Sequence, residues 1–234
     1  MDGTTRLDAL TPETTARSLA GTVAEGGTPL SFYRDQLLPR VQDKVMDRGT
    51  TRDVRARVCA GLRGDIVEIG FGTGLNVAYY PPGITKVMAI EPSRVCMRIA
   101  QSRIDSSRRV VELAGLDGAR LDLPSESFDA VLSTWTLCSI PDVARAMGEI
   151  RRVLKPGGSF HFVEHGHAPD PEIARWQRRL ERLNKRLAGG CHLTRQIPET
   201  IEQGGFTVEQ LDCYYIKGEP KPFSYTFEGR AIRA

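Results

Sequence analysis

The sequence predicts an α/β fold in which helices cover both faces of a doubly wound, mostly parallel sheet of seven strands. Three observations lead to this prediction. Short apolar runs alternate with segments of helical periodicity, and such alternation builds a parallel sheet with right-handed crossovers. A glycine-rich turn directly follows the first apolar run. The last two apolar runs have no helix between them, which indicates an antiparallel hairpin at the sheet edge.

Length and composition favour one globular domain. The 234 residues carry 32 Lys and Arg against 29 Asp and Glu, a net charge of +3. That charge is too small to indicate nucleic-acid binding, and no run approaches the ~18 apolar residues of a membrane span. The five cysteines are scattered and include no Cys-x-x-Cys pair, which disfavours disulfides and structural zinc. We therefore expect a cytoplasmic protein.

Two regions precede the predicted sheet. Residues 1–30 are expected to form a flexible arm, because glycines and Pro29 punctuate a polar stretch, and 31–234 are expected to form the single domain. Apolar residues recur at helical spacing over 32–46, where Pro39 predicts a kink or two short helices.

The remaining elements follow from periodicity and turn residues. Strands are predicted over 66–69, 86–90, 109–113, 128–133, 159–164, 207–213 and 224–232. Helices are predicted over 52–62, 94–102 and 143–153, and in the stretch after Gly74. One more helix, at about 171–190, lies outside the alternation, and we expect it to be an inserted lid.

The turn after the first strand carries the strongest chemical signal. Gly70, Gly72 and Gly74 alternate there, which allows a tight turn and lets a ligand lie against bare backbone. Leu75 stands where a dinucleotide fingerprint needs glycine, so a nicotinamide or flavin cofactor is disfavoured. Glu68 would be awkward beside a pyrophosphate but suits a ligand with a positively charged amino group.

A carboxylate follows the second predicted strand. Glu91 lies 21 residues beyond Gly70, at about the place where an acid can accept both hydroxyls of a ribose. A solvated loop acid is the alternative for Glu91 alone, and the neighbouring glycine loop favours the ribose contact.

Five segments in this order resemble the class I S-adenosylmethionine-dependent methyltransferases. They are Glu68–Gly74, Glu91, Leu116–Ala119, Ser127–Val131 and Arg151–Gly158. The resemblance covers roughly residues 60–165 and implies a Rossmann-like fold, with S-adenosylmethionine as cofactor and S-adenosylhomocysteine as product. A non-catalytic protein that binds the same cofactor is the alternative of another class.

The resemblance also implies roles for individual residues. The three glycines would line the amino-acid end of the cofactor, Glu91 would hold the ribose, and Ser133 and Thr134 would approach the methionine moiety. Asp117 would contact the adenine amino group beside Gly118, although the family usually shows Asp-Ala-Glu where this chain has Asp-Gly-Ala. The full implied set is Glu68, Gly70, Phe71, Gly72, Thr73, Gly74, Asn76, Glu91, Pro92, Asp117, Gly118, Ser133 and Thr134.

The substrate is expected outside the carboxyl ends of the strands. Residues predicted on that side are Trp135, Cys138, His165 and Trp176. His165 is the candidate general base, whereas Cys138 and Cys191 are interpreted as packing residues. A metal site could also be read from Glu164, His165, His167, Cys191 and His192. Their spacing matches no standard zinc pattern, so no metal is predicted.

The inserted helix is amphipathic. Its apolar stripe consists of Ile173, Trp176, Leu180, Leu183 and Leu187, and its other faces carry six basic and two acidic residues. This pattern fits a lid that packs its stripe over the active site. It also fits a basic helix that touches an anionic membrane or delivers a lipophilic substrate.

A narrower resemblance concerns the methyl acceptor. Thr136–Ile140, Val163–His165 and Gly189–Arg195 are similar to segments of the alkyl-thiol S-methyltransferases and their bacterial relatives. This branch implies a small apolar acceptor, with a thiol favoured. The alternatives are O- or N-methylation of a phenol, a quinone or a phospholipid. Animal members carry a hydrophobic N-terminal anchor that the first thirty residues lack, so any membrane contact is expected to be peripheral.

Overall fold

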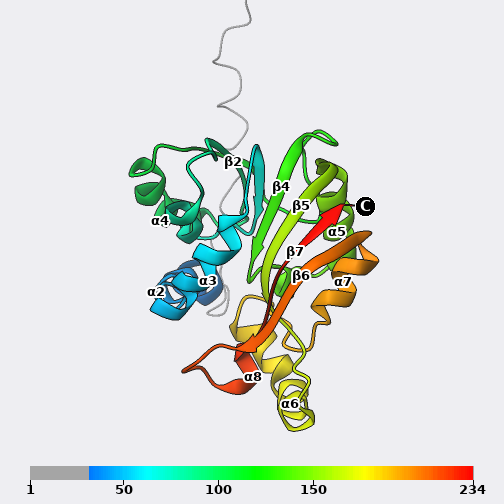
Figure 1. Cartoon of the computed structure of the whole chain (residues 1–234). Helices are drawn as coiled ribbons and strands as arrows, with labels where there is room; N and C mark the ends of the chain where they lie inside the picture. Colours follow the sequence, from blue (N-terminus) through cyan, green and yellow to red (C-terminus); the bar gives the residue numbers. More distant parts are fainter. Residues whose placement is uncertain (1–31, 234) are drawn as a thin grey trace, which may run out of the picture.

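Residues 32–233 are described by the computed structural model, and they build one twisted seven-stranded sheet with helices on both faces (Figure 1). The strands are β1 (Ile66–Ile69), β2 (Lys86–Ile90), β3 (Val110–Gly115), β4 (Phe128–Thr134), β5 (Leu154–His165), β6 (Phe206–Tyr215) and β7 (Tyr225–Arg233). Their order is β3-β2-β1-β4-β5-β7-β6. Strands β1 to β5 pair in parallel, and β7 pairs antiparallel with both β5 and β6. This confirms the predicted fold class. The expected N-terminal arm lies outside the described residues.

The helical segments are η2 (Tyr33–Leu37), α2 (Leu38–Met46), α3 (Gly49–Ala60), η3 (Leu75–Tyr79), α4 (Arg94–Asp105), η4 (Leu137–Ser139), α5 (Val143–Val153), α6 (Pro171–Leu187), α7 (Ile197–Gln203) and α8 (Lys221–Ser224). The predicted break at Pro39 corresponds to a π-helical turn, η2, followed by α2 with Pro39 in its first turn. The stretch after Gly74 forms only the short 3₁₀-helix η3, because Pro81 and Pro82 follow it closely. Helix α7 was not predicted, since seven residues show too little periodicity.

Each face of the sheet closes over its own hydrophobic cluster. On one face Met147 and Ile150 of α5 and Ile201 of α7 pack against the strands. On the other face Val58 of α3 and Val77 of η3 do the same. Strand β1 is therefore buried along its whole length, and a strand covered on both sides reads as a continuous apolar run. This double burial explains why the sequence predicts β1 so well.

The segment Lys155–Gly158, which links α5 to the sheet, forms the irregular start of β5. Gly157 has a φ of +73°, and the pairing of β4 with β5 shifts register between Phe128 and Ala130. Lys155 Nζ lies 2.7 Å from Asp129 Oδ1. The segment lies remote from the carboxyl ends of the strands, so we interpret it as a structural turn.

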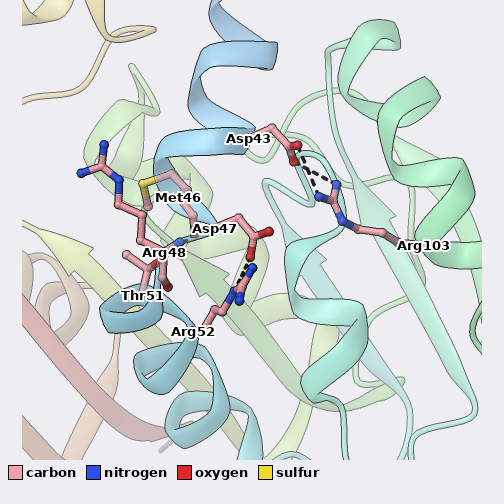
Figure 2. Close-up of polar contacts among 7 residues, drawn as sticks. All are labelled: Asp43, Met46, Asp47, Arg48, Thr51, Arg52 and Arg103. Carbon is pink, nitrogen blue, oxygen red and sulfur yellow. Dashed lines mark hydrogen bonds and ion pairs between the residues drawn. The ribbon is translucent and has the colours of Figure 1, made fainter.

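The junction between α2 and α3 is held by local polar contacts (Figure 2). Thr51 Oγ1 accepts the backbone N–H of Arg48 at 3.1 Å and donates to the Met46 carbonyl at 2.8 Å. Arg52 Nε pairs with Asp47 Oδ1 at 2.7 Å. The capping interaction satisfies a free donor at the start of α3, so the two helices meet at a defined angle. Within residues 32–233, no helix combines the length and the apolar character needed to span a bilayer.

Candidate functional site

A cavity of about 1160 Å³ opens at the carboxyl ends of the parallel strands. It lies where the strand order reverses between β1 and β4, which is the usual ligand position in such sheets. The glycine loop lines one end, and Cys138, His165 and Cys191 line the other. Helix α2, Asn184 near the end of α6, and Gly189 just after that helix complete the walls.

The cavity brings together about half of the residues predicted to bind the cofactor. Those that line it are Gly70, Phe71, Gly72, Thr73, Glu91, Pro92 and Thr134. Those that do not are Glu68, Gly74, Asn76, Asp117, Gly118 and Ser133. Asp117 is exposed, and its carboxylate accepts the backbone N–H of Ala119 at 2.8 Å. Ser133 is fully buried and donates to Glu164 Oε1 at 2.7 Å.

On the substrate side, Trp135, Cys138 and His165 line the cavity and Trp176 does not. Trp176 is 46% exposed on α6. The reason is the orientation of α6, which buries Gln177 instead: its side chain accepts the Ala168 N–H at 2.9 Å and donates to the Gly166 carbonyl at 3.0 Å. The apolar stripe of α6 is therefore only partly packed, and a lid movement of this helix stays a prediction.

The glycine loop and Glu91 form one unit. Gly70, Gly72 and Gly74 all have positive φ, at 71°, 58° and 75°, and a Cβ on Gly70 would lie 2.0 Å from Thr136 Oγ1. Glu91 accepts the backbone N–H groups of Gly72 and Ser93, both at 2.8 Å. Because a carboxylate can accept about four hydrogen bonds, Glu91 keeps acceptor capacity for a ligand.

A buried polar network lies below the glycine loop. Asn76 Nδ2 donates to Glu68 Oε1 at 2.8 Å, and the Tyr80 hydroxyl donates to Glu68 Oε2. Arg55 Nη1 donates to Asn76 Oδ1 at 2.7 Å and to Thr134 Oγ1 at 3.2 Å. Burial raises the pKa of Glu68 to about 7. The network thus joins a buried carboxyl and a buried cation through the Asn76 side chain.

Arg55 is a site residue that the sequence did not reveal. It is 5% exposed and lines the cavity, and its Nε has no hydrogen-bond partner among the described residues. Burial lowers the pKa of its guanidinium, but an arginine stays charged. An arginine inside a helix carries no sequence signal for this role. Only the packing of α3 against η3 and β5 brings it to the cavity.

Trp135 connects the two ends of the cavity. Its φ of +51° is strained for a bulky residue, and its backbone N–H donates to the Val163 carbonyl at 2.7 Å. The Arg55 guanidinium lies 4.9 Å from its ring centroid, and the His165 ring lies 6.3 Å away. Its indole Nε1 is buried without an acceptor among the described residues. Strain of this kind persists where a site requires it.

Glu164 organises the loop that carries Trp135 and Cys138. The carboxylate is fully buried and accepts the Ser133 hydroxyl at 2.7 Å, the Thr136 N–H at 3.0 Å and the Cys138 N–H at 3.3 Å. Burial raises its pKa, and these donors oppose that shift. Since its donors all belong to the protein and it does not line the cavity, Glu164 is a structural residue of the site.

Cys138, His165 and Cys191 meet at the far end of the cavity. One Sγ or ring nitrogen from each lies within 4.8 Å of the other two. His192 does not join them, because its Nδ1 pairs with Glu181 Oε1 at 2.9 Å. Both cysteines are buried, as packing residues are, but they also face one another and a histidine. The sequence hides this cluster, because its members are 27 and 26 positions apart and come from three different segments.

Helix α2 is fastened over the glycine loop by Arg103 of α4. Its guanidinium pairs with Asp43 Oδ1 at 2.9 Å (Figure 2) and donates to the Thr73 carbonyl at 2.8 Å. At the other side the Tyr33 hydroxyl donates to the Leu187 carbonyl at 2.9 Å. The segment over residues 33–46 therefore bridges the glycine loop and the end of α6.

Comparison with known proteins gives consistent results. The family model described as "Methyltransferase domain" matches residues 67–162. The chain is 35% identical to rat thiol S-methyltransferase TMT1B over 68% of this chain and 65% of the relative. It is 34% identical to mouse thiol S-methyltransferase TMT1B over 85% of this chain and 81% of the relative. The chain spans only 61% to 65% of the length of the rat protein and of human TMT1B and TMT1A.

The fold has relatives among solved structures. One from Thermotoga maritima, described as an SAM-dependent methyltransferase and possible histamine N-methyltransferase, has a TM-score of 0.62. The match covers 87% of this chain and 98% of the other, at 20% sequence identity.

Burial of Glu68 predicts a pH-dependent stability. Its pKa is about 7 in the folded protein against 4.5 ordinarily, so between these values the folded chain holds a proton that the unfolded chain has released. The contribution of Glu68 to the free energy of unfolding therefore falls by up to about 3 kcal/mol as the pH rises from 4.5 to 7. Glu68→Gln should remove this loss. We expect the stability difference between variant and wild type, from denaturant titrations, to grow from pH 4.5 to 7.

Glu202→Gln, on the exposed side of α7, is the matched control and should show no such trend. A Glu68→Gln difference that is independent of pH would mean that Glu68 titrates normally in the folded protein.

Proposed function

Since this chain belongs to the class I S-adenosylmethionine-dependent methyltransferases, we propose that it transfers a methyl group from S-adenosylmethionine to a small apolar acceptor, in first place a thiol. The mouse relative and the family model confirm the family that the sequence motifs indicate. The observation that carries the proposal is the cavity itself, which joins the glycine loop and Glu91 to an end lined by Trp135, Cys138 and His165. Donor and acceptor can thus meet in one space.

The cofactor end supplies complementary charge. In this proposal Glu91 accepts the ribose hydroxyls, and the positive-φ glycine loop lies against the methionine moiety. Arg55 binds the methionine carboxylate, because it is a buried cation at the cavity wall with an unused N–H. Glu68 lies behind the wall and acts on the cofactor ammonium only through Asn76 and Thr134.

Part of the cavity lining is apolar. Besides Trp135, the lining includes Leu38, Leu193 and Phe223. Methyl transfer is an in-line displacement, so the protein mainly has to hold the acceptor atom ~3 Å from the methyl carbon and exclude water. A thiol with a pKa near ~8.5 already holds a few per cent thiolate at neutral pH. Positioning can therefore suffice for a thiol, whereas a hydroxyl would need His165 as a base.

Cofactor binding is tested by calorimetry with S-adenosylmethionine and S-adenosylhomocysteine. Glu91→Ala removes hydrogen bonds to a charged acceptor and should weaken binding by about 1–3 kcal/mol. Arg55→Lys keeps the charge but loses the planar donor pair, so it should also weaken binding, by about 1 kcal/mol or more. The control Glu202→Ala should bind like wild type. Unchanged affinity in Glu91→Ala would show that the ribose is held elsewhere.

The acceptor is tested by S-adenosylhomocysteine release with alkyl thiols, phenols, quinols and phosphatidylethanolamine. We expect turnover with alkyl thiols. Turnover of a phenol alone, abolished by His165→Ala, would overturn the thiol assignment in favour of a base-assisted O-methyltransferase. Tight cofactor binding without turnover of any acceptor would favour the non-catalytic alternative.

We also propose that α6 and the segment over 33–46 make peripheral contact with an anionic membrane. Trp176, Leu183 and Leu187 share one face of α6 and are each about half exposed. Leu37 and Val41 are exposed on the neighbouring segment, which the Tyr33–Leu187 hydrogen bond joins to α6. The basic residues of α6 lie on one side of this apolar face and opposite it, which is the pattern of an interfacial helix.

Sedimentation with vesicles tests this contact. The protein should bind vesicles that contain phosphatidylserine and release them as salt rises, because the basic residues are screened. Leu183→Glu should reduce binding at least about fivefold, since it places a charge in the apolar face. The control Leu211→Glu changes an exposed leucine of β6 and should bind normally. Equal binding of both variants would contradict the proposal.

A further inference from the structure

We propose that Cys138, His165 and Cys191 bind a thiophilic metal ion of the Zn²⁺ type, with an open coordination position that faces the cavity. The use of this ion, to receive the acceptor thiol, rests on the function proposed above. The binding of the ion does not, because it depends only on the three side chains.

The geometry of the cluster suits such an ion. A zinc ion binds thiolate sulfur at about 2.3 Å and imidazole nitrogen at about 2.0 Å, which in a tetrahedron puts the ligand atoms roughly 3.3–3.8 Å apart. The three ligand atoms already lie within 4.8 Å of one another without an ion. Small side-chain rotations close the remaining gap. Two cysteines and one histidine with a free fourth position form a known catalytic type of zinc site.

The ligands are held from behind by the fold. The N–H of Cys138 donates to the Glu164 carboxylate at 3.3 Å. The backbone of Cys191 is fixed by its own N–H to Ala188 and by Asn184 Nδ2, which donates to the Cys191 carbonyl at 2.8 Å. His165 ends β5, where it pairs with β7. Such support determines the direction of each ligand before an ion arrives.

Charge favours the ion as well. Two thiolates in a buried position repel each other, and the nearby cation is Arg195, whose Nη1 already donates to the Ile140 carbonyl at 2.8 Å. A divalent ion neutralises both thiolates and leaves a pair that costs less to bury. Glu164 cannot compensate the charge of the thiolates, because its own charge is negative and its oxygens already accept three donors.

A disulfide between Cys138 and Cys191 is the competing use of the two thiols. It would explain the cysteines but not His165, which has a ring nitrogen within 4.8 Å of both sulfurs. It would also not explain why all three residues line the cavity that ends at the glycine loop. The metal ion accounts for all three residues.

The bound ion would activate the acceptor. A thiol that occupies the fourth position loses its proton to solvent and is held as a thiolate. Its sulfur attacks the methyl carbon of S-adenosylmethionine, the new S–CH₃ bond forms as the old one breaks, and the electron pair of the broken bond stays on the sulfur of S-adenosylhomocysteine. The product is a neutral thioether, a weaker ligand than the thiolate, so water displaces it and the site is restored.

The test uses the full chain, reduced, stripped of metal by dialysis against a chelator and titrated with Zn²⁺ or Co²⁺ alone. We expect one ion per chain and, with Co²⁺, the visible spectrum of tetrahedral thiolate coordination. Cys138→Ser, His165→Ala and Cys191→Ser should each weaken binding at least about tenfold, since even outer partners of metal ligands are worth that much. The control Cys96→Ser changes a buried cysteine of the same cavity outside the cluster and should bind the ion normally. Affinity for S-adenosylmethionine checks that each variant is folded.

The outcomes separate this inference from the proposed function. Stoichiometric zinc binding that depends on all three residues supports the site even if no thiol is methylated. Thiol methylation at full rate by a metal-free protein that binds no zinc would overturn the site and leave the proposed function intact. A reduced protein that binds no zinc and forms a Cys138–Cys191 disulfide in air would assign the thiols to redox chemistry instead.

Discussion

The burial of the Glu164 carboxylate is the constraint on which the site depends. A buried carboxylate is tolerated only when its oxygens are hydrogen-bonded, and here the donors come from Ser133, Thr136 and Cys138. These donors lie on both sides of Trp135, so satisfying one charge fixes the whole turn after β4. The turn then holds Trp135 at a strained positive φ and aims the Cys138 side chain toward the residue that follows Glu164. The hydrogen bonds of Glu164 thus determine the positions of Trp135 and Cys138 in the cavity wall.

At the opposite end of the cavity, the buried charge of Arg55 also requires hydrogen-bonded partners. Arg55 would be costly to bury alone, and so would Glu68. Placed together through Asn76, they form a hydrogen-bonded unit with almost no net charge when Glu68 is ionised. Removing one partner leaves the other uncompensated. A ligand with both an ammonium and a carboxylate matches this pair better than a ligand of one sign, which agrees with an amino acid at this end of the cavity.

What the sequence predicts depends on whether a feature is local. Strands β1 and β2 have the predicted bounds, because each is a short, mostly apolar and mostly buried run between polar turns. Contacts made by distant segments leave no such trace, which is why Arg55 and the grouping of Cys138 with Cys191 emerge only from the fold. Trp176 shows the limit of periodicity. The spacing identifies the apolar stripe of α6, but Gln177 decides which side of the helix packs against the segment after β5. The roles of the predicted cofactor residues themselves stay predictions.

The chemistry of the transfer connects the two ends of the cavity. S-adenosylmethionine carries a sulfonium cation, and a thiolate carries the opposite charge. Their reaction gives two neutral thioethers, so charge disappears as the transition state forms. An apolar enclosure favours such a reaction. It destabilises the charged sulfonium and thiolate more than the transition state, in which their charges are partly neutralised. Trp135, Leu193 and Phe223 are apolar residues of the cavity lining. A neutral hydroxyl would gain nothing from an apolar enclosure until a base had removed its proton. Apolar walls therefore assist a thiolate directly, whereas a hydroxyl must first lose its proton to a base such as His165, and this difference favours sulfur as the acceptor atom.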